Sequence, residues 1–547
     1  MAPSFGLSGF ASIITAASLV LATGCNGPTT DEGSTSAQVA QSPNGMVVSG
    51  SPLATDAGRR ILEQGGNAVD AAAATAFVLS VVEPTMSGLG GRTQMLIRLT
   101  DGSFVGLNGG TQVPLSYTSV TEETSDSAYG IGTIGTPGTV AALVKMVEDH
   151  GSMSLAEVMA PAIELAENGF PLPTGEALRL ATIRAKLSEF EGSRRYFLKQ
   201  GVPYSPGEIF VQTDLARTLR AVAEGGAEVF YTGWIADSIA EYMRRVGGYV
   251  TREDLRSFRA NESLVVRGNY RGYDLVGTYL PASGATTIEI LHLLEQFDLQ
   301  GLKPAEWAAL VTQSLLIGFE DRAANLGDEE TKPALLVSKE WARERAATIR
   351  VPSNASPTPA TTTESPNTTH LSVVDNNGMV VALTQSVGPN SGSKVAAPGL
   401  GFFFAATMEY LDVREPGQQP WSSQSPLIVM SQDQPILVVG AAGARRIISA
   451  IVETLSYAID YGLPLDEAMG RPRFHPTGQM LYMEDLTDLA WPDSTISNLG
   501  RLGFNAVPKG DQATYFARIH GIAFDSVRGT WIGVADKRWV GSAAGAN

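Results

Sequence analysis

The chain has 547 residues and a net charge of −17, and this acidity opposes binding to a phosphate backbone, so we expect no nucleic-acid partner. Hydrophobic residues make up 44% of the sequence, enough for a sizeable core in several domains or in one large layered fold. The single cysteine, Cys25, excludes intramolecular disulfides and thiolate zinc sites.

The N-terminal segment has the pattern of an export signal. Its apolar run, Phe10–Ala22, is too short to cross a bilayer but has the length of a signal-peptide core. The run leads into Leu21-Ala22-Thr23-Gly24-Cys25, which resembles a bacterial lipobox, although no Lys or Arg precedes Arg59. We expect residues 1–24 to be a signal peptide and Cys25 to carry a lipid, or else an ordinary cleaved signal with an incidental cysteine. The protein would then lie in the periplasm or at the cell surface, meeting the membrane only through the lipid.

Ordered structure is predicted to begin after a polar tether at residues 25–45, since this stretch has too few apolar residues to form a core. The first expected elements are a strand, two helices and a second strand, at Met46–Gly50, Pro52–Leu62, Ala68–Val82 and Gln94–Leu99. Residues 141–345 are dominated by amphipathic helices and are interpreted as scaffold.

A second biased segment lies at residues 351–367, which are rich in Pro, Ser and Thr and predict a mobile linker. Two apolar runs follow directly, Leu371–Asp375 and Met379–Thr384, and the residues between them, Asn376-Asn377-Gly378, are typical of a hairpin turn. Thr368 therefore stands at the head of a predicted buried strand, immediately behind a flexible chain.

This position gives Thr368 a route to nucleophilic chemistry. A threonine hydroxyl is a weak nucleophile without an adjacent base, and cleavage between Asn367 and Thr368 would create one, the free α-amine of Thr368. The alternative is structural, because threonine is common where strands begin. His370 is interpreted as a structural residue of the strand. The remaining histidines are far apart in sequence, so we expect neither a metal site nor a cofactor.

The string TTHLSVVDNNGMVVALTQS at 368–386 resembles the small-subunit start of the γ-glutamyltransferases, which are self-cleaving N-terminal nucleophile hydrolases. The resemblance extends over nearly all of residues 46–540. It includes, in the family's order, GGNAVDAAAATAFVLSVVEPTMSGLGG (65–91), GTPGTV (135–140), VQTDLARTLRAVAEGGAEVFYTGWIADSIAEYM (211–243), GGYVTREDL (247–255), WSSQSPLIV (421–429) and IDYGLPLDEAMGRPRFH (459–475).

The resemblance implies a four-layer αββα sandwich of the α+β class, built jointly by two chains that arise from self-cleavage. The large-subunit region would be 46–367 and the small-subunit region 368–547, and the mature protein would be a heterodimer of its own cleavage products. The implied reaction transfers a γ-glutamyl group from a glutathione-like small-molecule donor to water or an amine, with Thr368 as nucleophile.

The resemblance also implies roles for residues around the nucleophile. Ser386 corresponds to a family hydroxyl that hydrogen-bonds the nucleophile, and it keeps the donor and acceptor. Gly443 and Ala444 correspond to the Gly-Gly turn whose main-chain amides stabilise the oxyanion. An alanine in the second position is compatible with this role provided that its φ is negative.

At the substrate end the sequence departs from the family. Gly110 stands where an arginine pairs with the donor's α-carboxylate, and no Lys or Arg occurs between Arg98 and Lys145. Tyr410 stands where an acidic residue receives the α-ammonium, and Gly388 replaces an asparagine. Of the α-carboxylate site, Ser422 and Ser423 remain.

Arg92 is new relative to the family's glycine run, and we consider it a candidate replacement for the missing guanidinium; alternatively it faces solvent or pairs with a carboxylate. Residues 411–421 are too short for the lid loop of many relatives, so the cleft is expected to admit larger acyl groups.

Three functions therefore compete: a lipid-tethered, self-processing γ-glutamyl hydrolase or transferase, an acylase that uses the same nucleophile on another amide, and a non-catalytic relative that acts as a binding protein. Thr368, Ser386 and the 443–444 turn favour an active enzyme, whereas the changed donor residues argue against conventional glutamyl recognition.

Overall fold

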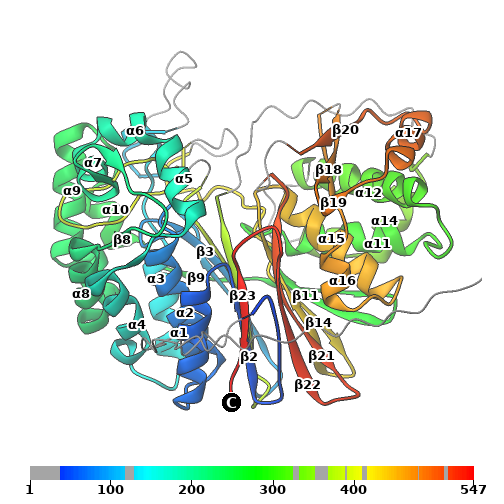
Figure 1. The fold of residues 1–547 in the computed structure, drawn as a ribbon, viewed down its shortest axis with the longest axis horizontal. Helices are drawn as coiled ribbons and strands as arrows, with labels where there is room; N and C mark the ends of the chain where they lie inside the picture. The colour runs from blue at the N-terminus through cyan, green and yellow to red at the C-terminus, as the bar shows by residue number, and fades with distance from the viewer. Residues whose placement is uncertain are drawn as a thin grey trace, which may run out of the picture. The chain divides into compact units, whose positions relative to one another are not determined.

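The computed structural model describes residues 37–117, 129–324, 332–350, 367–388, 391–408, 415–478, 480–510 and 515–547. Within this part of the chain two β-sheets pack face to face, and a layer of helices covers the outer side of each sheet (Figure 1). The four-layer αββα architecture predicted from the sequence is confirmed.

The first sheet carries the predicted hairpin at its centre. Its strands, in spatial order, are β23 (Ser542–Gly545), β2 (Gly45–Ser49), β12 (Thr369–Asp375), β13 (Val380–Ser386), β3 (Arg92–Arg98), β4 (Phe104–Gly109) and β9 (Asn261–Ser263). Neighbouring strands are antiparallel throughout. Both predicted chains contribute, because β12, β13 and β23 lie after Thr368 and the other strands lie before it.

The second sheet is also shared between the two regions. Its strands, in spatial order, are β1 (Val39–Ser42), β22 (Thr530–Ala535), β21 (Arg518–Asp525), β15 (Gln434–Val439), β14 (Leu427–Ser431), β11 (Tyr273–Thr278) and β10 (Val265–Tyr270), with β16 (Ala441–Ala442) paired to β21. Apolar side chains from both sheets, including Val48, Leu96, Val380 and Ile522, form the core between them.

The helices fall into two groups, one on each side of the sheets (Figure 1). Those on the first sheet are α1 (Pro52–Glu63), α2 (Ala68–Val82), α3 (Thr139–His150), α4 (Leu155–Asn168), α5 (Thr174–Thr182), α6 (Arg184–Glu189), α7 (Glu191–Phe197), α8 (Thr213–Tyr231), α9 (Trp234–Val246) and α10 (Arg252–Ser257). Those on the second sheet are α11 (Gly284–Glu295), α12 (Pro304–Ala324), α13 (Lys332–Leu336), α14 (Lys339–Ala346), α15 (Arg446–Ile459), α16 (Leu465–Met469) and α17 (Asp493–Arg501).

Short elements complete the described chain. They are the 3-10 turn η2 (Ile131–Thr133), the small sheet of β17 (Phe474–Thr477), β18 (Met480–Leu486), β19 (Leu489–Ala490) and β20 (Ala506–Lys509), and the pairs β5 (Phe170–Pro171) with β8 (Ile209–Phe210) and β6 (Leu198–Lys199) with β7 (Val202–Pro203).

Helix α2 shows how the sequence sets local structure beneath the site. Asn67 caps it by accepting hydrogen bonds from the backbone N–H groups of Val69 and Asp70, and the Asp70 carboxylate accepts the N–H of Asn67 in return. Every residue of the helix is buried, as its nearly continuous apolar sequence predicts. Its C-terminal end leads into Glu83 and Thr85, which lie close to the nucleophile.

One sequence-based boundary is wrong. The tether predicted at 25–45 extends too far, because Val39–Ser42 form β1 and pair with β22. The stretch 141–345 is dominated by helices, as expected, and it also contributes β9, β10 and β11 to the central sheets. β11 pairs with β14 from beyond Thr368, and long-range pairing of this kind leaves little local signal in the sequence. The signal-peptide residues, Cys25 and residues 351–366 of the linker lie outside the described residues.

Candidate active site

Thr368 lies at the end of strand β12, opposite the end of β13. Thr369 pairs with Gln385, so the next pair in the register is Thr368 with Ser386. The Thr368 hydroxyl donates a hydrogen bond to the Ser386 hydroxyl at 3.2 Å, and both residues are buried. The two sequence-predicted residues are therefore in contact.

Ser386 also contacts the peptide bond that precedes Thr368. Its hydroxyl donates to the carbonyl oxygen of Asn367 at 2.5 Å, and its oxygen accepts the backbone N–H of Gly388 at 2.9 Å. In this uncleaved chain one hydroxyl thus holds both the Thr368 hydroxyl and the carbonyl that the hydroxyl would attack. The arrangement polarises the carbonyl and draws the proton of Thr368 towards Ser386.

Further contacts fix the two residues of this peptide bond. The side-chain amide of Asn367 donates to the carbonyl oxygen of Thr85 at 2.9 Å, and Arg518 on β21 donates to the carbonyl oxygen of Thr368 at 3.2 Å. Arg518 was not identified from the sequence, because an isolated arginine on a buried strand carries no motif.

The candidate oxyanion turn lies next to the same strand. Ala442 on β16 pairs with Arg518, and the ring of His370 packs against Gly440, where an added Cβ would stand 2.1 Å from the ring. A Cβ on Gly443 would stand 2.7 Å from Ala517, so the turn tolerates no side chain there.

Ala444 does not have the negative φ that its expected role required. Its φ is +57°, in the left-handed region, not negative as the sequence interpretation required. Crowding between Cβ and the backbone makes this conformation unfavourable for residues other than glycine. The turn therefore keeps the conformation of a glycine while carrying an alanine.

His370 has the structural environment expected from the sequence. It is fully buried, with Nδ1 2.8 Å from the Thr384 hydroxyl and Nε2 3.2 Å from the Ser372 hydroxyl. Burial lowers the pKa of its imidazole, so the ring stays neutral.

Arg92 lies in the same row of the sheet as the nucleophile. It pairs directly with Ser386 and is only 5% exposed, so it does not face solvent. Its Nη2 atom stands 3.5 Å from the point that a Cβ on Gly388 would occupy. The guanidinium therefore reaches the backbone that hydrogen-bonds Ser386, and the missing side chain of Gly388 leaves it room.

Amide side chains fill the place of the family arginine. Asn108 accepts the N–H of Gly110 at 2.7 Å and donates to the side-chain oxygen of Gln419 at 2.6 Å, and Gln419 donates to the carbonyl of Gly110 at 3.2 Å. A Cβ on Gly110 would stand 3.3 Å from Gln419. An arginine at position 110 would displace this network of neutral amides.

Ser422 and Ser423 have different partners, and Ser422 is linked to strand β13, which carries Ser386. Ser422 donates to the side chain of Gln424, and Gln424 in turn donates to the carbonyl of Thr384 on β13 at 2.9 Å. Arg322 on α12 donates to the hydroxyl of Ser423 at 3.2 Å. Arg322 is a cation at the serine pair that the sequence did not reveal. Tyr410 lies outside the described residues.

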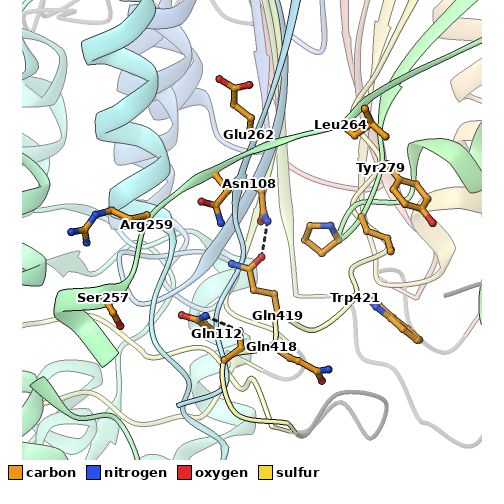
Figure 2. A pocket seen from close by; sticks show the side chains of 14 residues that line it. Asn108, Gln112, Ser257, Arg259, Glu262, Leu264, Tyr279, Gln418, Gln419 and Trp421 are labelled. Carbon is orange, nitrogen blue, oxygen red and sulfur yellow. Dashed lines mark hydrogen bonds between the residues drawn. The ribbon is translucent and has the colours of Figure 1, made fainter. Parts of the chain in front are cut away.

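A pocket of about 880 Å³ lies beside the Asn108–Gln419 network (Figure 2). Its walls combine amide and hydroxyl groups with apolar side chains, among them Trp421, and with the charged side chains of Arg259 and Glu262. The lining residues are Asn108, Gln112, Ser257, Arg259, Asn261, Glu262, Leu264, Tyr279, Leu280, Pro281, Gly417, Gln418, Gln419 and Trp421.

In the described part of the chain, no group of three His, Cys, Asp or Glu side chains is placed to hold a metal ion. The described helices include none that is both long and apolar enough to cross a membrane.

Comparison with known proteins gives consistent matches over this fold. The model of the gamma-glutamyltranspeptidase family matches residues 54–546. The chain belongs to this family. It is 34% identical to the glutathione hydrolase proenzyme of Pseudomonas sp. (strain A14), over 79% of this chain and 81% of that protein.

Acylases are also among its relatives. The acylase ACY 1 proenzyme of Pseudomonas sp. (strain V22) is 31% identical over 85% of this chain and 87% of that protein. A crystal structure of cephalosporin acylase from Bacillus halodurans matches with a TM-score of 0.85 at 27% identity, covering 95% of this chain and 99% of that one. The γ-glutamyltranspeptidase family member described here is thus an N-terminal nucleophile hydrolase with amidohydrolase and acyltransferase relatives.

The strained turn gives a test of this geometry. Ala444→Gly should raise the free energy of unfolding by about 0.5–1 kcal/mol, because relief of the left-handed strain exceeds the entropy cost of glycine. Urea unfolding of the two proteins measures the difference. Ala441→Gly, in the extended strand next to the turn, is the matched control and should destabilise. Equal destabilisation by both substitutions would contradict a strained Ala444.

Proposed function

We propose that this family member cleaves itself between Asn367 and Thr368 and then uses Thr368 as an N-terminal nucleophile on side-chain amides of the γ-glutamyl type, with water or an amine as acceptor. The observation that carries the proposal is the Ser386 hydroxyl, which contacts both the Thr368 hydroxyl and the Asn367 carbonyl.

Self-cleavage would follow from this contact. The Thr368 oxygen adds to the carbonyl carbon of Asn367, its proton passes to the amide nitrogen, and the C–N bond breaks to leave an ester. The break of the C–N bond already frees the α-amine of Thr368, and water then hydrolyses the ester to give the Asn367 carboxylate and the free Thr368 hydroxyl. The products are a large and a small chain that remain associated through the shared sheets.

The mature enzyme would repeat the same chemistry on a donor. The α-amine takes the proton from the Thr368 hydroxyl as it attacks the donor's amide carbon, and the main-chain N–H groups of Gly443 and Ala444 stabilise the oxyanion. The amine leaves with the proton, and water or a second amine accepts the acyl group from Thr368.

Donor recognition is the part of the proposal in which this chain departs from a γ-glutamyl enzyme. The amide network at Gly110 cannot neutralise an α-carboxylate, and we assign that role to Arg92 in the row of Ser386, with Ser422 and Ser423 as further contacts. The large, mixed polar and apolar pocket lined by Trp421 suits an acyl group that extends beyond a glutamyl head (Figure 2). These features favour an acylase as the second candidate function.

We also propose, from the sequence, that the enzyme is exported and tethered to the membrane by a lipid on Cys25. The apolar run at Phe10–Ala22 and the lipobox-like residues that end at Cys25 support this location.

The self-cleavage proposal is tested with variants of two hydroxyls. Thr368→Ala should stay a single chain, and Ser386→Ala should cleave about 100-fold more slowly, because the carbonyl loses its donor and the nucleophile its acceptor. Ser386→Thr keeps the hydroxyl and should still cleave. Electrophoresis and mass spectrometry identify the chains, and a wild-type protein that never cleaves would refute the proposal.

The donor proposal is tested with p-nitroanilides of three acyl groups: γ-glutamyl, glutaryl and pentanoyl. We expect the glutaryl amide to be turned over best and the γ-glutamyl amide about 100-fold less efficiently in kcat/KM, because a buried ammonium without an acidic partner is costly. Arg92→Ala should slow the glutaryl amide about tenfold or more and spare the pentanoyl amide. Arg98→Ala, at the other end of β3, is the control.

Either of two results would contradict this assignment. Efficient γ-glutamyl turnover that survives Arg92→Ala would mean that other residues hold the donor's charges. Equal loss for all three amides in Arg92→Ala would indicate a general structural defect.

The location is tested with Cys25→Ser. We expect wild-type protein to fractionate with membranes and to carry the mass of a lipid on its N-terminal peptide, and the variant to be released into the soluble fraction. Unmodified wild-type protein in the cytosol would exclude the anchor.

A further inference from the structure

A buried charged cluster lies behind the nucleophile, where it contacts Thr368 and Thr369 directly and Asn367 through Thr85. It contains two acids, Glu83 and Glu176, and two arginines, Arg179 and Arg518, arranged around the indole of Trp539. The guanidinium groups of Arg179 and Arg518 lie 4.2 Å and 4.8 Å from the centre of that ring. The indole N–H donates to Glu83 at 3.0 Å.

Each contact of the cluster with the reacting segment is specific. Glu176 accepts both the N–H and the hydroxyl of Thr85, whose carbonyl holds the side chain of Asn367. The carboxylate of Glu83 and the hydroxyl of Thr369 meet over Gly50, where an added Cβ would lie 2.8 Å from the hydroxyl oxygen and 3.1 Å from the carboxylate.

Arg518 has the contact nearest to the chemistry. Its Nη2 donates to the carbonyl oxygen of Thr368 at 3.2 Å. The nitrogen of a residue lies about 3 Å from its own carbonyl oxygen, so the guanidinium is about 6 Å or less from the nitrogen that becomes the α-amine. A cation at this distance disfavours a second positive charge.

We propose that Arg518 is a positioning residue that keeps the α-amine of Thr368 unprotonated, and therefore basic, in the mature enzyme, and that Glu83 and Glu176 behind it moderate this effect. The inference rests on the proposed function, since it concerns the base that self-cleavage creates. An unprotonated amine is what the attack of the Thr368 hydroxyl requires.

The charges around Arg518 support this role. Burial and the neighbouring Arg179 lower the pKa of Arg518 to about 9, while Glu83, Asp536 and Glu176 oppose the change. Burial and the nearby Glu176 raise the pKa of Glu83 to about 7. Burial also raises the pKa of Glu176, against the attraction of Arg179. Arg473 and Arg538 hold the pKa of Asp536 low against its burial, so this group stays anionic.

The direction of each effect follows from the signs of these charges. An unperturbed α-amine has a pKa of about 7.7–8.0, and a like charge nearby lowers it by about one unit or more. Removing the cation of Arg518 should raise the pKa of the amine, whereas removing the negative charge of Glu83 should lower it. A merely structural role for the cluster would change activity without moving the pH dependence in opposite directions.

The experiment measures kcat/KM against pH for the self-cleaved enzyme, with glutaryl-p-nitroanilide as the probe. The acid limb reports protonation of the base in the free enzyme. We expect Arg518→Met to move this limb to higher pH by about one unit or more, and Glu83→Gln to move it to lower pH. Arg528→Met is the matched control, because Arg528 is exposed and pairs with Asp525 at the distant end of the β21–β22 hairpin.

If Arg518→Met fails to cleave itself, Arg518→Lys is measured in its place. It keeps the positive charge, so its acid limb should lie at the same pH as that of the wild type. Glu83→Gln tests the sign independently, since it preserves the shape of the side chain. The inference would be overturned if the acid limbs of Arg518→Met and Glu83→Gln both lay at the wild-type pH, or if both moved in the same direction. A wild-type enzyme that neither cleaves nor turns over the probe would instead refute the proposed function.

Discussion

The antiparallel pairing of β12 with β13 is the constraint on which the active site depends. It puts Thr368 opposite Ser386, and the pairing of β13 with β3 extends the row to Arg92. Directly opposed residues in a sheet project from the same face, so these three side chains converge. A slip of one residue would send each to the other face, and the buried apolar residues of all three strands oppose such a slip.

The changes at the donor end are coupled sterically. The space for the Arg92 guanidinium exists because Gly388 has no side chain, and the Asn108–Gln419 network exists because Gly110 has none. Each glycine thus leaves room for a polar side chain from another strand or loop. In the proposed function, Arg92 takes the role that the resemblance assigns to an arginine at position 110, and it lies one strand closer to Thr368 than β4 does.

The sequence predicted those features of the structure that depend on local apolar patterns and on residue type. The hairpin of β12 and β13, the buried helix α2 and the contact between Thr368 and Ser386 all follow from apolar runs, turn residues and a matching motif. It did not predict β11, Gln419 or Arg518, because each of these depends on pairing between segments far apart in the chain. The positive φ of Ala444 was not predicted from the sequence either, since the backbone conformation of a tight turn is set by the surrounding residues and not by the alanine itself.

The buried cluster behind Thr368 connects stability with chemistry. Four ionisable groups out of water are costly, and the loss of any one leaves its neighbours with uncompensated charge. Glu83 and Glu176 balance Arg179 and Arg518 when all are ionised, and the ring of Trp539 contacts both cations while its N–H donates to Glu83. Because Glu83 has a pKa of about 7, protonation below neutral pH leaves the cluster with a net positive charge next to Thr368. Protonation of Glu83 therefore removes a buried anion and at the same time strengthens the positive electrostatic potential at the α-amine of Thr368. The basicity of this amine and the net charge of the buried cluster thus change over the same pH range.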